Sequence, residues 1–237
     1  MPNQTFVFKQ FSIHQDKCAM KVGTDAVLLG SWVNAENVQH ILDIGTGTGI
    51  IALMLAQKTI ASIDAIDIDE NACLQATENK DACNWKNRVQ IHCISLQDFS
   101  KKSTKKYDVI VSNPPYFIDS SKALGIERTT ARHTDLLSFE ELIDGVISLL
   151  QKNGKFCIIL PFKEGETFIE MANEKKLFLT KLMRVKTTQG KVAKRIMMQF
   201  EFARNTFSES SIIIEKEERH SYTDDYIALT KEYYLGF

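Results

Sequence analysis

The fold is decided by residues Ile41–Leu53, which read ILDIGTGTGIIAL. A short apolar run is followed by closely spaced glycines and then by a helix-like pattern, which predicts a strand, a turn and the start of a helix. Glycine adopts positive φ at no steric cost and lets the backbone approach a ligand closely. Dinucleotide-binding folds and methyl-donor-binding folds both use such a loop, so further residues are needed to separate them.

Strand-like and helical patterns alternate along the rest of the chain, which is typical of an α/β protein with a largely parallel sheet. The last two strand candidates have no helix between them and predict an antiparallel hairpin at the sheet edge. Seven strands are expected in all. After the glycine loop, the predicted strands are Ser62–Asp69, Arg88–Ile94, Tyr107–Ser112, Lys155–Leu160, Phe178–Lys186 and Ala193–Phe202, and the predicted helices are Glu70–Ala82, Ser138–Leu150 and Glu164–Lys175.

With 237 residues, of which 44% are hydrophobic and 25% charged, the chain can bury a sizeable core as a single domain over residues 1–237. Its net charge of −1 argues against a long nonspecific DNA-binding surface, although a local basic patch could bind a structured RNA. No apolar stretch has the length of a membrane span and no signal peptide is evident, so we expect a cytoplasmic protein. The cysteines and histidines are scattered, so we expect reduced thiols and no metal site.

The glycine spacing is Gly-x-Gly-x-Gly rather than Gly-x-Gly-x-x-Gly, and Asp43 stands just before it. In this respect the loop resembles the first motif of class I S-adenosylmethionine-dependent methyltransferases. The resemblance implies a Rossmann-like fold and S-adenosylmethionine as the methyl donor. It also implies that Asp43 helps to hold the donor's amino group, while the loop packs against adenosine and methionine through Gly45, Thr46, Gly47 and Gly49.

Acidic residues follow the next two strand candidates, where an open α/β sheet binds its ligand. Asp67 lies about twenty positions past the glycines and is expected to accept hydrogen bonds from ribose hydroxyls. Asp69 is interpreted as the N-cap of the following helix. Asp98 is expected to accept from the adenine amino group, with the apolar neighbours Ile68 and Phe99 against the ring. For each acid, an ordinary surface position at a strand end is the alternative.

The tetrad Asn113-Pro114-Pro115-Tyr116 follows the apolar run that ends at Ser112. An exocyclic adenine amine is a poor nucleophile because its lone pair is delocalised into the ring. The Asn113 side-chain oxygen and the Pro114 carbonyl could each accept one N–H, which aims the lone pair at a methyl donor. Tyr116 would stack on the base, and Pro115 with Pro114 would stiffen the turn. The plainer alternative is a proline turn that closes a strand.

Over nearly its full length the chain resembles the bacterial tRNA1(Val) adenine-37 N6-methyltransferases. The most specific segments are Phe8–Trp32, FKQFSIHQDKCAMKVGTDAVLLGSW, and Tyr222–Leu235. The resemblance implies a tRNA substrate and a short N-terminal extension, residues 1–35, that completes the donor pocket. It places four residues beside the donor's methionine end: Lys21, Gly23, Thr24 and Asp25. Thr24-Asp25 before an apolar run is also a plain helix N-cap.

Two basic regions are candidates for RNA contacts. The first is the predicted C-terminal hairpin, where Lys191, Lys194 and Arg195 are expected to reach phosphates. The rival is Lys101–Lys106, which is equally consistent with solubilising charge. After the tetrad, Arg128 and Arg132 are expected to shape the entrance for the target base. The charge run 215–219 is interpreted as solvated surface.

Other readings share the tetrad. A glutamine N5-methyltransferase acting on release factors also uses Asn-Pro-Pro-Tyr, but that family has a helical domain ahead of its glycine loop, and only about forty residues precede Asp43 here. A DNA adenine methyltransferase would need a target-recognition region for which the chain has no room. A donor-independent RNA-binding module is the alternative from a different class, and it predicts no donor binding. We expect a monomer.

Overall fold

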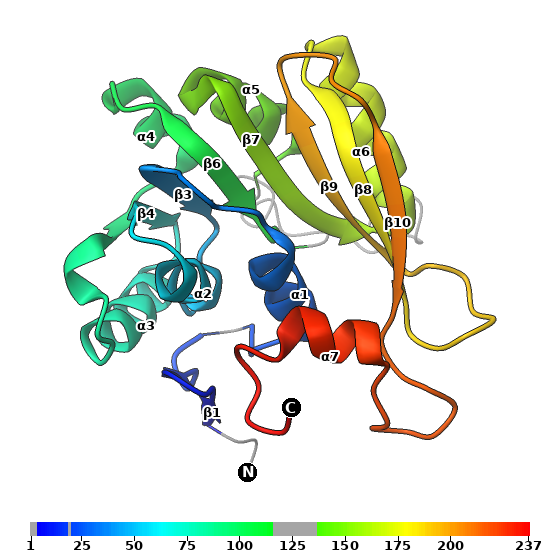
Figure 1. The fold of residues 1–237 in the computed structure, drawn as a ribbon. Helices are drawn as coiled ribbons and strands as arrows, with labels where there is room; N and C mark the ends of the chain where they lie inside the picture. The colour runs from blue at the N-terminus through cyan, green and yellow to red at the C-terminus, as the bar shows by residue number, and fades with distance from the viewer. Residues whose placement is uncertain (1–3, 19, 116–136) are drawn as a thin grey trace, which may run out of the picture.

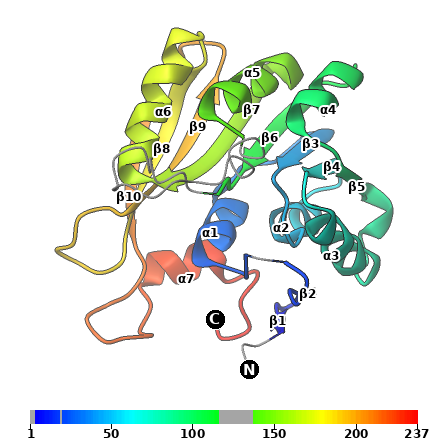
Figure 2. The ribbon, with the colours of Figure 1, turned by 180° about the vertical axis from the view of Figure 1, so that it is seen from behind.

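The computed structural model describes residues 4–18, 20–115 and 137–237. Its main feature is an eight-stranded sheet with helices on both faces (Figures 1 and 2). The strands lie in the order β10-β8-β9-β7-β6-β3-β4-β5. Their bounds are β3 (His40–Ile44), β4 (Ser62–Asp67), β5 (Val89–Cys93), β6 (Tyr107–Ser112), β7 (Leu150–Pro161), β8 (Phe178–Lys186), β9 (Arg195–Glu201) and β10 (Ser208–Ile213).

The helices that lie between consecutive strands of the large sheet connect parallel strands, as the alternating pattern predicts. Strands β5, β4, β3, β6 and β7 are mutually parallel, and β9 is antiparallel to both of its neighbours. The helices are α1 (Thr24–Trp32), α2 (Ile50–Lys58), α3 (Glu70–Asp81), α4 (Leu96–Lys102), α5 (Phe139–Leu149), α6 (Phe162–Glu174) and α7 (Asp224–Thr230), with a 3₁₀ turn at Lys86–Arg88. None of the helices in the described residues is long and apolar enough to cross a membrane.

Two hydrophobic cores lie on opposite faces of the sheet because strand side chains alternate in direction. In β6, Val109 and Val111 belong to the core under α1 and α2, whereas Ile110 belongs to the core under α4, α5 and α6. All three are fully buried. Central strands covered on both faces therefore read as continuous apolar runs.

The predicted fold class is confirmed, and the sheet has one more strand than expected. Strand β10 pairs in parallel with β8 at the end of the sheet, so β10 forms the outer edge instead of the predicted β8–β9 hairpin. Its sequence, SESSII, has no apolar alternation, and Ser208–Ser211 are exposed. Only Ile212 is buried. A polar edge strand of this kind has no periodic signal, which explains why sequence patterning misses it.

The carboxyl ends of four parallel strands meet at one place. Ile44 pairs with Ser112 on one side and with Ile66 on the other, and Asp67 pairs with Cys93. The segments that leave β6, β3 and β4 therefore begin side by side. This is the edge of an open α/β sheet where ligands bind.

The described N-terminal and C-terminal segments pack together on the side of α7 away from the sheet (Figure 1). Strands β1 (Thr5–Val7) and β2 (Ser12–His14) form a small antiparallel pair. The Lys9 backbone N–H donates to the Tyr233 carbonyl at 2.8 Å, and its ammonium donates to the Phe237 carbonyl at 2.7 Å. These bonds hold the N-terminal and C-terminal segments against each other.

Candidate active site

The glycine loop between β3 and α2 has three residues in the left-handed region, Gly45, Gly47 and Gly49, with φ of 71°, 55° and 83°. At Gly45 and Gly47, a Cβ would meet no atom within 4 Å, so the loop borders open space. At Gly49 a Cβ would lie 3.3 Å from the Ala76 side chain. The first two glycines thus form a cradle, and the third allows α3 to pack closely.

Asp43 lies at the end of β3 and is fully buried. Its Oδ2 accepts from the Thr46 hydroxyl at 2.7 Å and from the Ala52 N–H at 3.2 Å. Burial raises the pKa of this carboxyl from 3.8 to about 7, and the two hydrogen bonds partly oppose the rise. Its Oδ1 has no partner among the described residues. A buried acceptor without a partner is costly, so Oδ1 is suited to a ligand that brings a donor or a positive charge.

Asp67 ends β4 and faces the same loop. Its Oδ2 accepts from the Gly47 N–H at 2.8 Å, and its Oδ1 accepts from the Asp69 N–H at 3.0 Å. Each carboxylate oxygen keeps a lone pair for a further donor. Ile68 follows and is 57% exposed, which leaves an apolar side chain beside the carboxylate. Asp69 caps α3 by accepting from the Asn71 N–H at 2.8 Å, as predicted.

The third predicted donor contact has a weaker geometric basis. Asp98 is exposed in the first turn of α4, after the Ser95 cap. Phe99 is buried, and its ring packs against His92 at 5.5 Å and Tyr107 at 6.5 Å between centroids. These are the contacts of a core side chain. The predicted contacts of Asp98 and Phe99 with a bound adenine stay predictions.

The start of the tetrad directly follows β6 and lies beside the glycine loop. Ser112, whose hydroxyl donates to the Ile44 carbonyl at 2.9 Å, anchors this point to β3. Asn113 is half-buried, and its Oδ1 has no partner in the described part of the chain. Pro114 is buried and Pro115 exposed. An acceptor oxygen is thus held at the sheet edge next to the cradle, which is what the predicted chemistry requires.

Three of the predicted site residues, Tyr116, Arg128 and Arg132, lie outside the described residues. Their roles in base stacking and at the substrate entrance remain sequence predictions. Among the residues that are described, no group of three or more potential metal-binding side chains occurs.

The segment before α1 is fastened to α3 by two buried amides that sequence reasoning missed. Asn79 accepts from the His14 N–H at 2.8 Å and donates to the carbonyls of His14 and Thr48. Gln75 accepts from the Lys17 N–H at 2.9 Å. Both amides are fully buried. Polar residues four apart on a buried helix face are the signal that could have revealed them, because such groups need fixed partners.

Within that segment, Lys21 donates its ammonium to the carbonyls of Gln15 and Cys18, so its described contacts are with the backbone. The prediction that Thr24-Asp25 caps α1 is wrong: the N-cap is Gly23, without a side-chain hydrogen bond. Asp25 lies in the first turn, where its charge favours the helix dipole. Its Oδ2 accepts from Arg195 Nε at 2.9 Å. The donor contacts predicted for Lys21, Gly23, Thr24 and Asp25 stay predictions.

The basic side chains of the predicted hairpin differ in whether they are exposed or engaged within the protein. Lys191 and Lys194 are exposed on the loop between β8 and β9, which projects from the sheet (Figure 1), and neither ammonium has a partner in the ranges described. Arg195 is engaged by Asp25 and by the Lys194 carbonyl. We therefore expect phosphate contacts from the two lysines and a mainly structural role for the arginine.

In the rival basic patch, Lys101–Lys106, some of the ammonium groups also bind other groups of the protein. Lys105 forms an ion pair with Asp64 at 2.7 Å, and Lys106 donates to the Ser148 carbonyl. Lys101 and Lys102 stand in the last turn of α4, where a positive charge favours the helix dipole. The patch thus has structural reasons for its charges.

Comparisons with known proteins agree with this geometry. Residues 18–178 match the family described as Methyltransferase small domain. The chain is 46% identical to the tRNA1(Val) (adenine(37)-N6)-methyltransferase of Bacteroides fragilis over 99% of each chain, and 42% identical to that of Trichodesmium erythraeum over the full length of both. The chain belongs to the tRNA1(Val) (adenine(37)-N6)-methyltransferase family.

Solved structures support the fold of this family member. A predicted O-methyltransferase from Agrobacterium tumefaciens superposes with a TM-score of 0.72 over 88% of this chain and 96% of the other, at 15% identity. A ribosomal protein L11 methylase from Lactobacillus delbrueckii superposes with a TM-score of 0.56 over 78% and 82%, at 17% identity. These similarities concern architecture, and the full-length relatives carry the family assignment.

Proposed function

We propose that this protein transfers a methyl group from S-adenosylmethionine to N6 of adenine 37 in tRNA1(Val). The observation that carries the proposal is Asn113 Oδ1, which has no hydrogen-bond partner among the described residues and is held beside the glycine cradle at the end of β6. Full-length relatives with that name support the choice of substrate.

The donor site is proposed from residues whose geometry fits the ligand. Gly45 and Gly47 border open space, and Asp67 keeps acceptor capacity at the end of β4. Asp43 has a buried oxygen without a partner in the part of the chain that the structure describes. Asp43 would hold the amino group, and Asp67 the ribose hydroxyls. S-adenosylmethionine supplies an electrophilic methyl group when it is bound.

The chain's own part in the chemistry is positioning. Asn113 Oδ1 and the Pro114 carbonyl would each accept one N–H of the adenine amine, so that its lone pair points at the methyl group. The amine becomes acidic as it gains the methyl group and can lose its proton to solvent, so no strong general base is needed. The target adenine must leave its stack, because these acceptors lie at the floor of the sheet edge.

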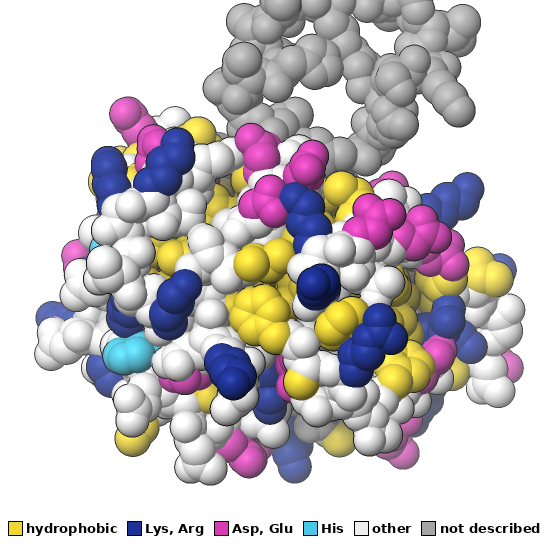
Figure 3. Space-filling view, turned by 90° about the horizontal axis from the view of Figure 1, so that it is seen from above, with side chains coloured by type: hydrophobic (Ala, Val, Ile, Leu, Met, Phe, Trp, Pro, Cys, Tyr) yellow, Lys and Arg dark blue, Asp and Glu magenta, His cyan; other side chains and the backbone are white. Residues whose placement is uncertain are grey.

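Surface charge supports an RNA approach from the hairpin side. The loop between β8 and β9 offers the exposed Lys191 and Lys194. On the end of the molecule opposite α7, basic side chains are interspersed with acidic and apolar ones and form no continuous band in the part described (Figure 3). Phosphates favour continuous positive surface, so that end is the poorer RNA-binding face.

Mass spectrometry of nucleosides tests the proposal. Purified protein is incubated with S-adenosylmethionine and unmodified tRNA1(Val), or with a tRNA carrying guanine at position 37. We expect N6-methyladenosine from the first RNA only. A methyl group on guanine or cytosine, or recovery only on a protein glutamine, would contradict the substrate, while failure to bind donor would favour an RNA-binding module.

The proposal includes three features of the molecule as a whole. We infer one domain over residues 1–237, in which segment 1–35 completes the donor pocket, and a monomeric enzyme in the cytoplasm. The ties from His14 and Lys17 to α3 support the role of the N-terminal segment. Light scattering on the purified protein tests the monomer, and a dimer mass would overturn it.

A further inference from the structure

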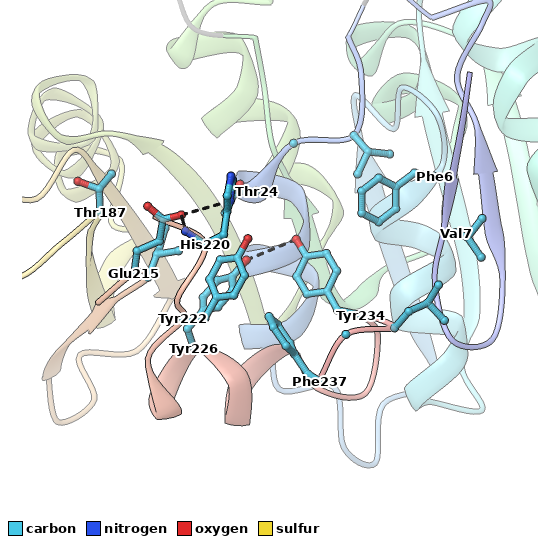
Figure 4. Close-up of a pocket in the computed structure, with 15 residues that line it drawn as sticks. Phe6, Val7, Thr24, Thr187, Glu215, His220, Tyr222, Tyr226, Tyr234 and Phe237 are labelled. Atoms are coloured by element: carbon cyan, nitrogen blue, oxygen red, sulfur yellow. Dashed lines mark hydrogen bonds and ion pairs between the residues drawn. The ribbon is translucent and has the colours of Figure 1, made fainter. Parts of the chain in front are cut away.

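A cavity of about 670 Å³ lies between β1, the start of α1 and the C-terminal segment (Figure 4). Its size is that of a small-ligand pocket. It contains no glycine of the loop after β3 and none of the described tetrad residues, and it shares Gly23 and Thr24 with the segment predicted to border the donor. The cavity therefore adjoins the proposed reaction centre without containing it. Its aromatic walls are Phe6, Tyr222, Tyr226, Tyr234 and Phe237.

The cavity walls are held in place by contacts from three parts of the chain. The Tyr233 hydroxyl donates to the Met54 carbonyl at 3.1 Å, and Lys9 binds the carbonyls of Tyr233 and Phe237. Gln57 donates to the Glu232 carbonyl at 3.0 Å. The segment 232–237 is thus anchored on both sides of the aromatic residues, and the cavity is preorganised.

The lining suits a flat, neutral ring. Tyr222 and Tyr226 are stacked with centroids 5.2 Å apart, and Phe237 meets Tyr222 edge-on at 5.2 Å. The Tyr226 and Tyr234 hydroxyls point toward each other across the pocket (Figure 4) and lie 3.4 Å apart. Burial raises the pKa of both, so the hydroxyls stay protonated and uncharged. Tyr226 is buried against Tyr222, whereas Tyr222, Tyr234 and Phe237 are partly exposed, and exposed aromatic rings stack on nucleobases.

The polar lining of the cavity favours a base over a phosphate as the ligand. Glu215 lines the cavity and is only partly exposed, which corrects its interpretation as solvated surface. Its Oε1 accepts from the His220 backbone N–H at 3.1 Å, and its backbone forms an isolated β-bridge with Tyr222. Its carboxylate would accept N–H donors of a base and repel a phosphate, and the His220 ring, 3.9 Å away, also lines the cavity. The Thr187 hydroxyl adds further hydrogen-bonding capacity.

The cavity also adjoins the surface proposed to meet phosphates. Thr187 begins the loop that carries Lys191 and Lys194, and its carbonyl accepts from the Glu215 N–H at 2.8 Å. An RNA strand whose phosphates meet the two exposed ammonium groups would pass the cavity mouth. Its backbone would remain outside on the positive loop while a base enters the aromatic lining.

We propose that this cavity binds an unpaired base of the substrate RNA other than the target adenine. This inference rests on the proposed function, because it takes the RNA substrate from there. It gives the C-terminal segment Tyr222–Leu235, which the chemistry at Asn113 does not use, a part in substrate recognition. A stacked base of this kind should improve RNA affinity about tenfold to a hundredfold.

The proposal is tested by combining changes of single RNA bases with a change in the protein. Full-length tRNA1(Val) is prepared with one unpaired base at a time, other than position 37, replaced by an abasic residue, and binding is measured with S-adenosylhomocysteine present. One abasic position should weaken wild-type binding about tenfold or more. Tyr222→Leu keeps apolar volume without a flat ring, so it should weaken binding of intact tRNA by a similar factor. The affinity of this variant should not fall further when that position is abasic. Phe207→Ala is the matched control, because Phe207 is 48% exposed, lies just before β10 and is outside the cavity lining.

The outcomes separate this inference from the proposed function. Suppose that the wild-type protein methylates tRNA, but each abasic replacement lowers the affinity of Tyr222→Leu as much as that of the wild-type protein. The cavity then holds no RNA base, and only this inference fails. If the wild-type protein neither binds nor methylates tRNA, the proposed function fails and this inference with it. Phe237→Leu provides the second variant should Tyr222→Leu misfold, and 2-aminopurine at the sensitive position should change its fluorescence on binding wild-type protein.

Discussion

Arg195 at the start of β9 donates from Nε to Asp25 Oδ2 in the first turn of α1, at 2.9 Å and across 170 residues of sequence. Both side chains are less than one-third exposed. The pair joins the basic hairpin to the segment expected to border the donor site. It changes the interpretation of Arg195, because a guanidinium engaged in the protein is less available to a phosphate.

We predict that this pair contributes to folding stability. Asp25→Ala and Arg195→Ala should each lower the free energy of unfolding, and the double variant should lose less than the sum, with a coupling of about 1 kcal/mol. Urea denaturation of the four proteins measures it. The exposed pair of Lys216 with Asp224, 3.3 Å apart, is the control and should show a smaller coupling. Strict additivity at Asp25 and Arg195 would contradict the prediction.

Lys191 and Lys194 should supply the phosphate contacts of the hairpin. Replacing both by Ala should weaken tRNA binding and flatten the slope of log affinity against log salt by about one to two units, with donor affinity unchanged. Arg195→Ala should change that slope less than Lys191→Ala or Lys194→Ala does. Filter binding over a salt series provides the measurement, and an unaltered slope in the double lysine variant would show that these charges only aid solubility.

Asp67 should be required for donor binding, whereas its neighbour Asp69 should not. Asp67→Ala removes a charged acceptor, and such bonds contribute roughly 1.5–3 kcal/mol, so donor affinity should fall about tenfold to a hundredfold. Asp69→Ala removes the cap of α3 and should cost about 1 kcal/mol of stability with donor affinity retained. Calorimetry with S-adenosylmethionine and urea denaturation distinguish the two. Equal donor affinities in both folded variants would remove Asp67 from the site.

Asn113 should act in the chemical step. Asn113→Ala removes an acceptor that matters most as positive charge develops on the amine, so the single-turnover rate should fall about a hundredfold to a thousandfold with little change in donor affinity. Asn113→Asp keeps an acceptor in place and should be less impaired than the alanine variant. A rate loss that is fully recovered at high tRNA concentration would instead assign Asn113 to substrate binding.

The stability of the ligand-free protein should fall as pH rises because of Asp43. Its pKa is 3.8 in the unfolded chain and about 7 in the fold, so between these values the folded state binds more protons and loses stability with rising pH. Asp43→Asn removes this dependence. The stability of the variant relative to wild type should therefore increase by roughly 2–3 kcal/mol from about pH 5 to about pH 8. A flat difference for Asp43→Asn across this range would refute the assignment.

Several features of the fold and site could be predicted from sequence because neighbouring residues encode them. Alternating patterns predict the parallel strands, the spacing of Gly45, Gly47 and Gly49 predicts a loop with positive φ, and Asp69 before a helix predicts its cap. The position of Asn113 follows from the strand before it. Each of these depends on local backbone geometry or on a hydrophobic period, which a few adjacent residues determine.

Tertiary structure alone decided which distant groups meet. The sequence by itself determined the α/β class, the glycine loop and the place of the tetrad. It did not determine that Arg195 binds Asp25, that Asn79 fastens the N-terminal segment, or that Tyr222 lines an aromatic cavity. The physical reason is that a charge, an amide or a ring carries no local record of its partner. Its partner depends on which strands and helices the completed sheet brings together.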